Sequence, residues 1–66
     1  MRITGTVRTW DRKAWLGTIE SDGKSYLVRR DSFRRGTVLF ENQAVTFLPV
    51  NLLAGPTAQR IEVLPQ

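Results

Sequence analysis

The sequence predicts an all-β fold, a five-stranded antiparallel Greek-key barrel. Apolar and polar residues alternate with a period of two far more often than they recur at helical spacing. Turn signals separate five short runs of this kind, and a short helical motif lies between the third and the fourth. Closing so short a sheet into a barrel would remove its exposed edges. With 66 residues, the chain is expected to form a single domain, residues 1–66, around one small core.

The first three runs are predicted to form a meander of strands. The first strand covers residues 3–10 and ends at a turn in residues 11–13. The second covers residues 15–20, and the Asp22-Gly23 pair that follows is the strongest hairpin signal in the chain. The third strand covers residues 25–30.

The crossover and the last two strands follow from turn and breaker residues. The stretch D-S-F-R-R-G, residues 31–36, suits one helical turn with Asp31 as its N-cap and Gly36 at its end. The fourth strand is predicted at residues 43–48, ending at Pro49, and the fifth at residues 57–64 after a loop over residues 51–56. The expected aromatic core residues are Tyr26, Phe33, Phe40 and Phe47.

The positive charge of the chain is unevenly distributed. Nine of the ten cations lie in the first 36 residues with four acids, so this part carries +5 and the remainder −1. Eight of the ten are arginine, whose planar guanidinium binds phosphate in bidentate fashion and stacks on bases. The asymmetry favours a polyanionic partner, and the alternative is an ordinary solvated surface.

Several function classes have little support in the composition. The chain has no histidine and no cysteine, so it has no disulfide, no thiolate metal site and no imidazole base. Its six acidic residues show neither paired-carboxylate nor metal-ligand spacing. We therefore expect a protein that is not an enzyme and has no cofactor, metal or small-molecule substrate. Without an apolar leader or a membrane span, a cytoplasmic location with no membrane partner is expected.

Four segments together resemble the bacterial cold-shock domain over nearly the whole chain. They are G-T-V-R-T-W-D-R-K-A-W-L-G-T-I-E, D-G-K-S-Y-L-V-R-R-D-S-F, N-Q-A-V-T-F and G-P-T-A-Q-R-I-E-V. The strongest matches are turn and core residues such as Gly5, Val7, Gly17, Val45 and Phe47. The resemblance implies an OB-fold barrel that binds single-stranded RNA or DNA by stacking bases on exposed aromatic rings within a basic surface. It also implies a role as an RNA chaperone or a transcription or antitermination regulator.

The departures from the family pattern fall on the implied binding surface. In an ungapped alignment, Leu16 and Thr18 fall on family positions that carry aromatic rings, and Arg29 and Arg30 fall on a histidine and an aromatic position. A shifted alignment that treats Leu16 as an added residue would place Trp15 on one of the aromatic positions, and the sequence leaves both alignments open. We expect weak, low-specificity and salt-sensitive binding in which arginines replace part of the stacking. The expected nucleic-acid-binding residues are Arg8, Trp10, Lys13, Trp15, Leu16, Thr18, Leu27, Arg29 and Arg30.

The two tryptophans have different expected positions. Trp10, beside Arg8, is expected to be exposed on the binding face. Strict alternation sends Trp15 with Gly17 and Ile19 toward the barrel interior or its rim, whereas a bulge at this point would turn the ring outward. The sequence leaves both positions of Trp15 open.

A protein-docking module is the alternative function. A basic barrel that has lost aromatic rings could bind an acidic protein partner, for instance on the transcription or translation machinery. The candidate contacts are Leu16, Leu27 and the apolar stretch V-N-L-L-A at residues 50–54, because exposed leucines suit a protein better than a base.

Overall fold

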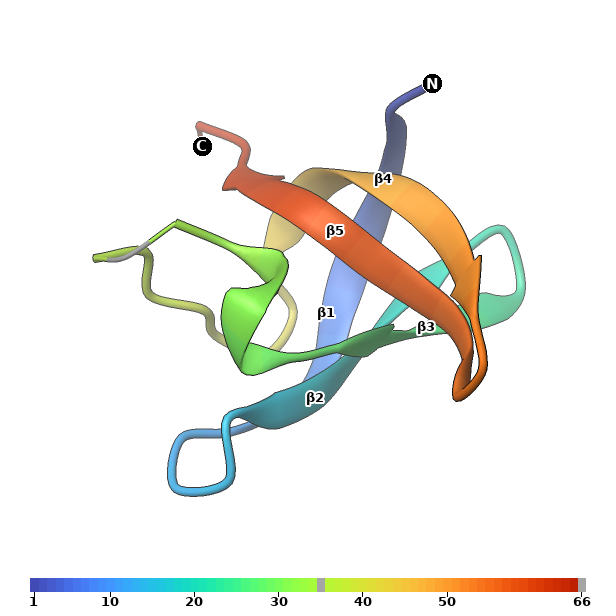
Figure 1. The fold of residues 1–66 in the computed structure, drawn as a ribbon. Helices are drawn as coiled ribbons and strands as arrows, with labels where there is room; N and C mark the ends of the chain where they lie inside the picture. The colour runs from blue at the N-terminus through green and yellow to red at the C-terminus, as the bar shows by residue number, and fades with distance from the viewer. Residues whose placement is uncertain (35, 66) are drawn as a thin grey trace.

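A computed structural model describes residues 1–34 and 36–65 as an all-β fold (Figure 1). The strands are β1 (Ile3–Asp11), β2 (Leu16–Ser21), β3 (Lys24–Val28), β4 (Ala44–Leu52) and β5 (Gly55–Val63), with one 3-10 turn, η1 (Arg30–Ser32), after β3. They close into a barrel in the order β1-β2-β3-β5-β4, with β4 pairing back onto β1. The five-stranded barrel is the fold that the sequence predicts.

Four of the five strand pairings are antiparallel, and the β3–β5 pairing is parallel. A closed ring with an odd number of strands cannot alternate in direction throughout. Two neighbouring strands must therefore run the same way, and β3 and β5 do so through the Leu27–Thr57 pair. The sequence predicts an antiparallel barrel, and the β3–β5 pair is the one strand pairing that departs from this prediction.

Two bulges interrupt the strand register. Between the Val7–Ile19 and Thr9–Thr18 pairs, β1 contains one extra residue, Arg8. In β5, Arg60 and Ile61 both oppose Phe47 of β4, and Arg60 has a left-handed backbone with a φ of 51°. A bulge bends its strand and re-aims the side chains around it.

The predicted end of the fourth strand at Pro49 is wrong. β4 continues to Leu52, and the expected loop over residues 51–56 is instead a tight connection between Leu52 and Gly55, which pair with each other. Past Phe47, β4 pairs only with β5 and no longer with β1. Pro49 therefore occupies an edge position, where a missing N–H group breaks no ladder hydrogen bond.

The helical turn begins earlier than predicted. The third strand ends at Val28, and Arg29 rather than Asp31 is the residue that caps η1. The backbone N–H of Arg29 donates to the Oγ of Ser32 at 2.9 Å, which stabilises the turn. Arg35, within the predicted helical turn, lies outside the described residues.

The barrel core is made mainly of β-branched and aromatic residues. Tyr26 and Phe47 are buried as predicted, with ring centroids 5.0 Å apart. Phe33 is only half-buried, and Phe40 is 52% exposed. The prediction of a core Phe40 is wrong because Leu39 fills the interior from this stretch. The other buried apolar residues are Val7, Ile19, Val28, Val45, Ala58 and Ile61.

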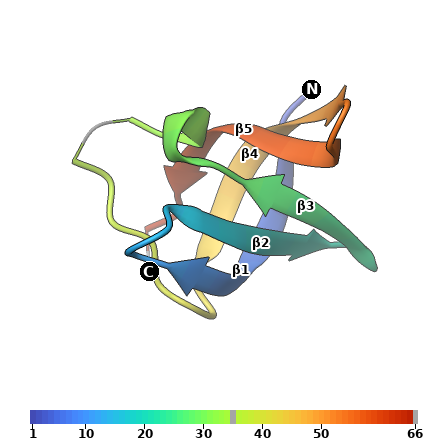
Figure 2. The same ribbon diagram turned by 60° about the horizontal axis from the view of Figure 1, so that its bottom comes forward.

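The connections gather at two opposite ends of the barrel. The β1–β2 turn, η1 and the stretch that leads into β4 lie at one end, on the left of both ribbon views (Figures 1 and 2). The β2–β3 and β4–β5 turns lie at the other end. No helix in residues 1–34 and 36–65 is long and apolar enough to cross a membrane.

Candidate nucleic-acid interface

Three rings form an aromatic cluster at the barrel end that carries η1. Trp10 comes from β1, Trp15 from the β1–β2 turn and Phe33 from the residue after η1. The Trp10 ring stands edge-on to Phe33, with centroids 5.4 Å apart, and edge-on to Trp15 at 6.2 Å. Trp15 and Phe33 lie nearly parallel, with 19° between their planes and 6.2 Å between centroids. We call Trp10, Trp15 and Phe33 the aromatic cluster.

The β1–β2 turn sets the position of Trp15. The Asp11 carbonyl accepts a hydrogen bond from the Trp15 N–H at 2.8 Å, and the Asp11 carboxylate accepts one from the Lys13 N–H at 2.9 Å. Trp15 has a left-handed backbone with a φ of 55°, a conformation that costs a non-glycine residue about 1–2 kcal/mol. The ladder begins only at the Asp11–Leu16 pair. Trp15 therefore lies outside the strand alternation, and it is 42% exposed.

Trp10 is half-buried, so the prediction that it is exposed on the binding face is wrong. It pairs with Gly17 of β2 and packs against the edge of the core. A Cβ atom on Gly17 would lie 2.8 Å from the Trp10 ring, so the ring fits only because residue 17 is a glycine. The Arg8 bulge shifts the register of β1 by one residue, and Trp10 therefore shares the inward face of Gly17.

Two guanidinium groups cover aromatic rings at this end. The Arg30 guanidinium carbon lies 5.4 Å from the centroid of the Trp15 ring, and that of Arg12 lies 5.8 Å from the centroid of Phe40. Such contacts contribute about 0.5–1 kcal/mol at exposed sites. Within the described residues neither arginine makes an ion pair, so their N–H groups are available to a phosphate.

A small cavity opens beside the tryptophans. Its volume is about 320 Å³, and it is lined by Trp10, Arg12, Trp15, Thr37, Val38 and Leu39. Two indole rings, apolar side chains and one cation are the lining that a planar, apolar-faced group such as a base prefers.

The outer face of β2 and β3 holds three further predicted residues but no ring. Leu16 is 47% exposed, while Thr18 and Leu27 are half-buried. Thr9, Thr18 and Leu27 pair in one row across three strands, with the Thr9 and Thr18 hydroxyl oxygens 3.0 Å apart. Flat stacking surface is thus concentrated at the barrel end rather than on this sheet face.

The remaining predicted cations differ in their availability. Arg8 lies in the β1 bulge, where its Nε is 2.8 Å from the Glu20 carboxylate, so its charge is largely compensated. Lys13 is exposed in the β1–β2 turn, and Arg29 is exposed at the cap of η1. The structure therefore brings Trp10, Trp15 and Arg30 into direct contact, and it leaves Arg8 paired with an acid.

Sequence reasoning missed Phe33 and Arg12 as candidate site residues. The sequence predicts a core position for Phe33, yet its ring contacts those of Trp10 and Trp15. Its local sequence does not distinguish it from a core phenylalanine, because only the tertiary approach of η1 to the β1–β2 turn creates the cluster. Arg12 was assigned to a turn, and its position over Phe40 also depends on tertiary structure.

Comparison with protein-family models finds no match, and a search of curated proteins finds no sequence relative. The candidate site therefore stands on its own geometry. Within the described ranges, no three side chains of the metal-binding types gather closely enough to hold a metal ion.

Proposed function

We propose that this protein binds single-stranded RNA or DNA weakly, with little sequence preference, through the aromatic cluster. The observation that carries the proposal is the partly exposed Trp15 ring, with the Arg30 guanidinium over it and the apolar cavity beside it. Bases stack on such rings whatever their identity, and guanidinium groups bind the phosphates that follow.

The small number of exposed rings limits the affinity. Each stacked base contributes about 1–3 kcal/mol, and Trp15 is the one exposed ring of the cluster, since Trp10 and Phe33 are half-buried. Phosphate contacts from arginines supply the remainder, and their contribution falls as salt rises. Binding is therefore expected to be weak, because few bases can stack, and salt-sensitive, because phosphate contacts supply much of the affinity.

The proposed cellular role is to keep strands unpaired. Weak, sequence-tolerant binding to single strands suits an RNA chaperone or a transcription or antitermination regulator. The resemblance to the cold-shock domain and the barrel fold support this role, and the absence of cysteine suits a cytoplasmic protein.

Titration of labelled oligonucleotides tests the proposal. Fluorescence anisotropy would be followed for labelled oligo-dT, a single-stranded RNA and a blunt duplex at low salt. We expect binding of both single strands and weaker binding of the duplex, whose bases are not free to stack. Equal affinity for duplex and single strand would contradict stacking, and no binding at tens of micromolar protein would contradict the function.

Protein docking is the second candidate, and one observation favours it. Leu53 is fully exposed and Leu52 is 40% exposed at the β4–β5 turn. This turn lies at the barrel end opposite η1 (Figures 1 and 2), so the leucines are not continuous with the aromatic cluster. Leu53→Asp should abolish capture of an acidic protein partner and leave oligonucleotide binding unchanged. If Leu53→Asp weakens oligonucleotide binding instead, the two surfaces are not independent.

A further inference from the structure

A second, larger groove lies next to the aromatic cluster. Its volume is about 890 Å³, and it runs between the C-terminal half of β5 and the chain around η1. Thr37 and Val38 line both this groove and the cavity beside Trp15. A strand that leaves the cavity therefore reaches the groove by crossing these two residues.

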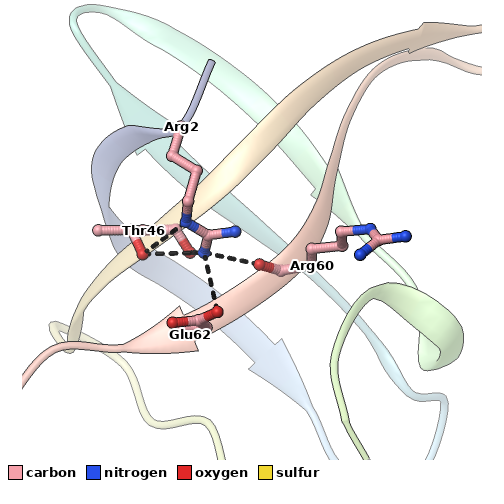
Figure 3. Close-up of polar contacts among 4 residues, drawn as sticks. All are labelled: Arg2, Thr46, Arg60 and Glu62. Atoms are coloured by element: carbon pink, nitrogen blue, oxygen red, sulfur yellow. Dashed lines mark hydrogen bonds and ion pairs between the residues drawn. The ribbon is translucent and has the colours of Figure 1, made fainter.

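Three arginines and two acids line this groove, and their charges are not equally available. The Arg2 guanidinium donates to the Thr46 carbonyl at 2.9 Å and to the Arg60 carbonyl at 2.7 Å (Figure 3). It also lies 4.0 Å from the Glu62 carboxylate, so Arg2 and Glu62 largely compensate each other. Within residues 1–34 and 36–65, Arg34 and Arg60 make no ion pair, and Asp31 is the remaining acid in the lining.

The backbone of Arg60 provides an independent observation. Arg60 has a φ of 51° at the β5 bulge, a conformation that glycine adopts without steric strain and arginine does not. In Figure 3 the Arg60 carbonyl points toward the Arg2 guanidinium, and the Arg60 side chain points away from it. The strained bulge thus presents a guanidinium to the groove, and strained residues often mark binding sites.

We propose that this groove, which we call the arginine groove, binds the phosphates of the strand that continues beyond the bases stacked on the aromatic cluster. Arg34 and Arg60 would be its phosphate ligands. The inference rests on the proposed function and adds a prediction about strand length. A strand long enough to cross Thr37 and Val38 gains contacts that a very short strand cannot reach.

Salt titrations with two strand lengths test the arginine groove. The affinities of a four-nucleotide and a twelve-nucleotide oligo-dT would be measured for the wild-type protein and for Arg60→Gly, Arg34→Ala and Lys24→Ala. Lys24 starts β3 at the opposite barrel end, so Lys24→Ala controls for the loss of one charge. Arg60→Gly removes the guanidinium while relieving the left-handed strain, so the melting temperature should not fall.

For the twelve-mer, each arginine variant should make the negative slope of log affinity against log salt shallower by about 0.7, the value for one lost phosphate contact on a single strand. The four-mer slope, and both slopes for Lys24→Ala, should match wild type. If both arginine variants bind the twelve-mer like wild type, the arginine groove is wrong while the proposed function stands. If wild type binds neither strand at low salt, both fail. Binding of polyglutamate in place of the twelve-mer would make the occupant an acidic peptide and overturn the proposal.

Discussion

The Arg30 guanidinium lies 5.4 Å from the centroid of the Trp15 ring, and these two residues come from different parts of the chain. Arg30 opens η1, and Trp15 ends the β1–β2 turn. Their contact places a cation beside a partly exposed stacking surface, which is the combination that a single strand needs. The arrangement requires both the left-handed turn at Trp15 and the capped η1.

Removing the Trp15 ring should weaken strand binding more than any loss of charge on the surface. Trp15→Ala should lower the affinity for oligo-dT by about 1–3 kcal/mol, or roughly 5- to 150-fold, because one stacked base is lost. Trp15→Phe keeps a ring and should retain most of the affinity. The measurement is anisotropy of a labelled strand, and equal affinities for Trp15→Ala and wild type would exclude a base on this ring.

Arg30 should contribute to strand binding both through its positive charge and through stacking of its planar guanidinium group. For a surface that neutralises about four to six phosphates, the slope of log affinity against log salt is expected to be roughly −3 to −4. Arg30→Ala should make this slope shallower by about 0.7. Arg30→Lys should restore the slope but only part of the affinity, since lysine cannot stack as a planar group. A lysine variant with full wild-type affinity would show that charge alone matters.

Gly17 should be essential for the position of Trp10. A Cβ atom at residue 17 would overlap the Thr9 carbonyl oxygen and lie 2.8 Å from the Trp10 ring. Gly17→Ala should therefore destabilise the fold by about 1–3 kcal/mol or more, as measured by urea unfolding. Its strand affinity should also fall at temperatures where the variant is folded, because Trp10 must move. An unchanged free energy of unfolding for Gly17→Ala would mean that β1 and β2 can move apart to accommodate the added methyl group, which would contradict the tight packing of Trp10 on Gly17.

Arg2 should stabilise the fold through carbonyl groups rather than through its ion pair. Its guanidinium donates to the backbone of both Thr46 and Arg60, whereas the Glu62 carboxylate is 4.0 Å away and exposed (Figure 3). Arg2→Ala should lower the free energy of unfolding by about 1–3 kcal/mol, from hydrogen bonds that contribute about 0.5–1.5 kcal/mol each. Glu62→Gln should change it by less than about 1 kcal/mol. If Arg2→Ala and Glu62→Gln lower the free energy of unfolding equally, the ion pair rather than the carbonyl hydrogen bonds is what stabilises the fold.

Alternation and turn residues were sufficient to predict the barrel. The Asp22-Gly23 pair connects β2 and β3, and Asp22 has the positive φ that such hairpins require. Burial of Tyr26 and Phe47 also follows from their strand phase. These features depend on residues close in sequence, and the alternation of apolar and polar residues along a strand indicates them directly.

The features that sequence did not predict depend on tertiary pairing. Pro49 ended the expected strand, but β4 has no second neighbour there and tolerates the proline. Trp15 was placed by alternation inside a strand, although a left-handed turn residue has no strand phase. The bulge at Arg8 shifts the face of Trp10, and no local residue pattern marks it. Of the residues that the structure brings together at the barrel end, the sequence therefore predicted Trp10, Trp15 and Arg30, but neither Phe33 and Arg12 nor the arrangement of the rings.

Tryptophan emission in single-indole variants tests the central claim most directly. Trp10→Phe leaves Trp15 as the sole indole, and Trp15→Phe leaves the half-buried Trp10. On titration with oligo-dT at low salt, the Trp15 emission should be strongly quenched and the Trp10 emission only weakly. Saturable strand binding without any quenching of Trp15 would contradict base stacking on the aromatic cluster.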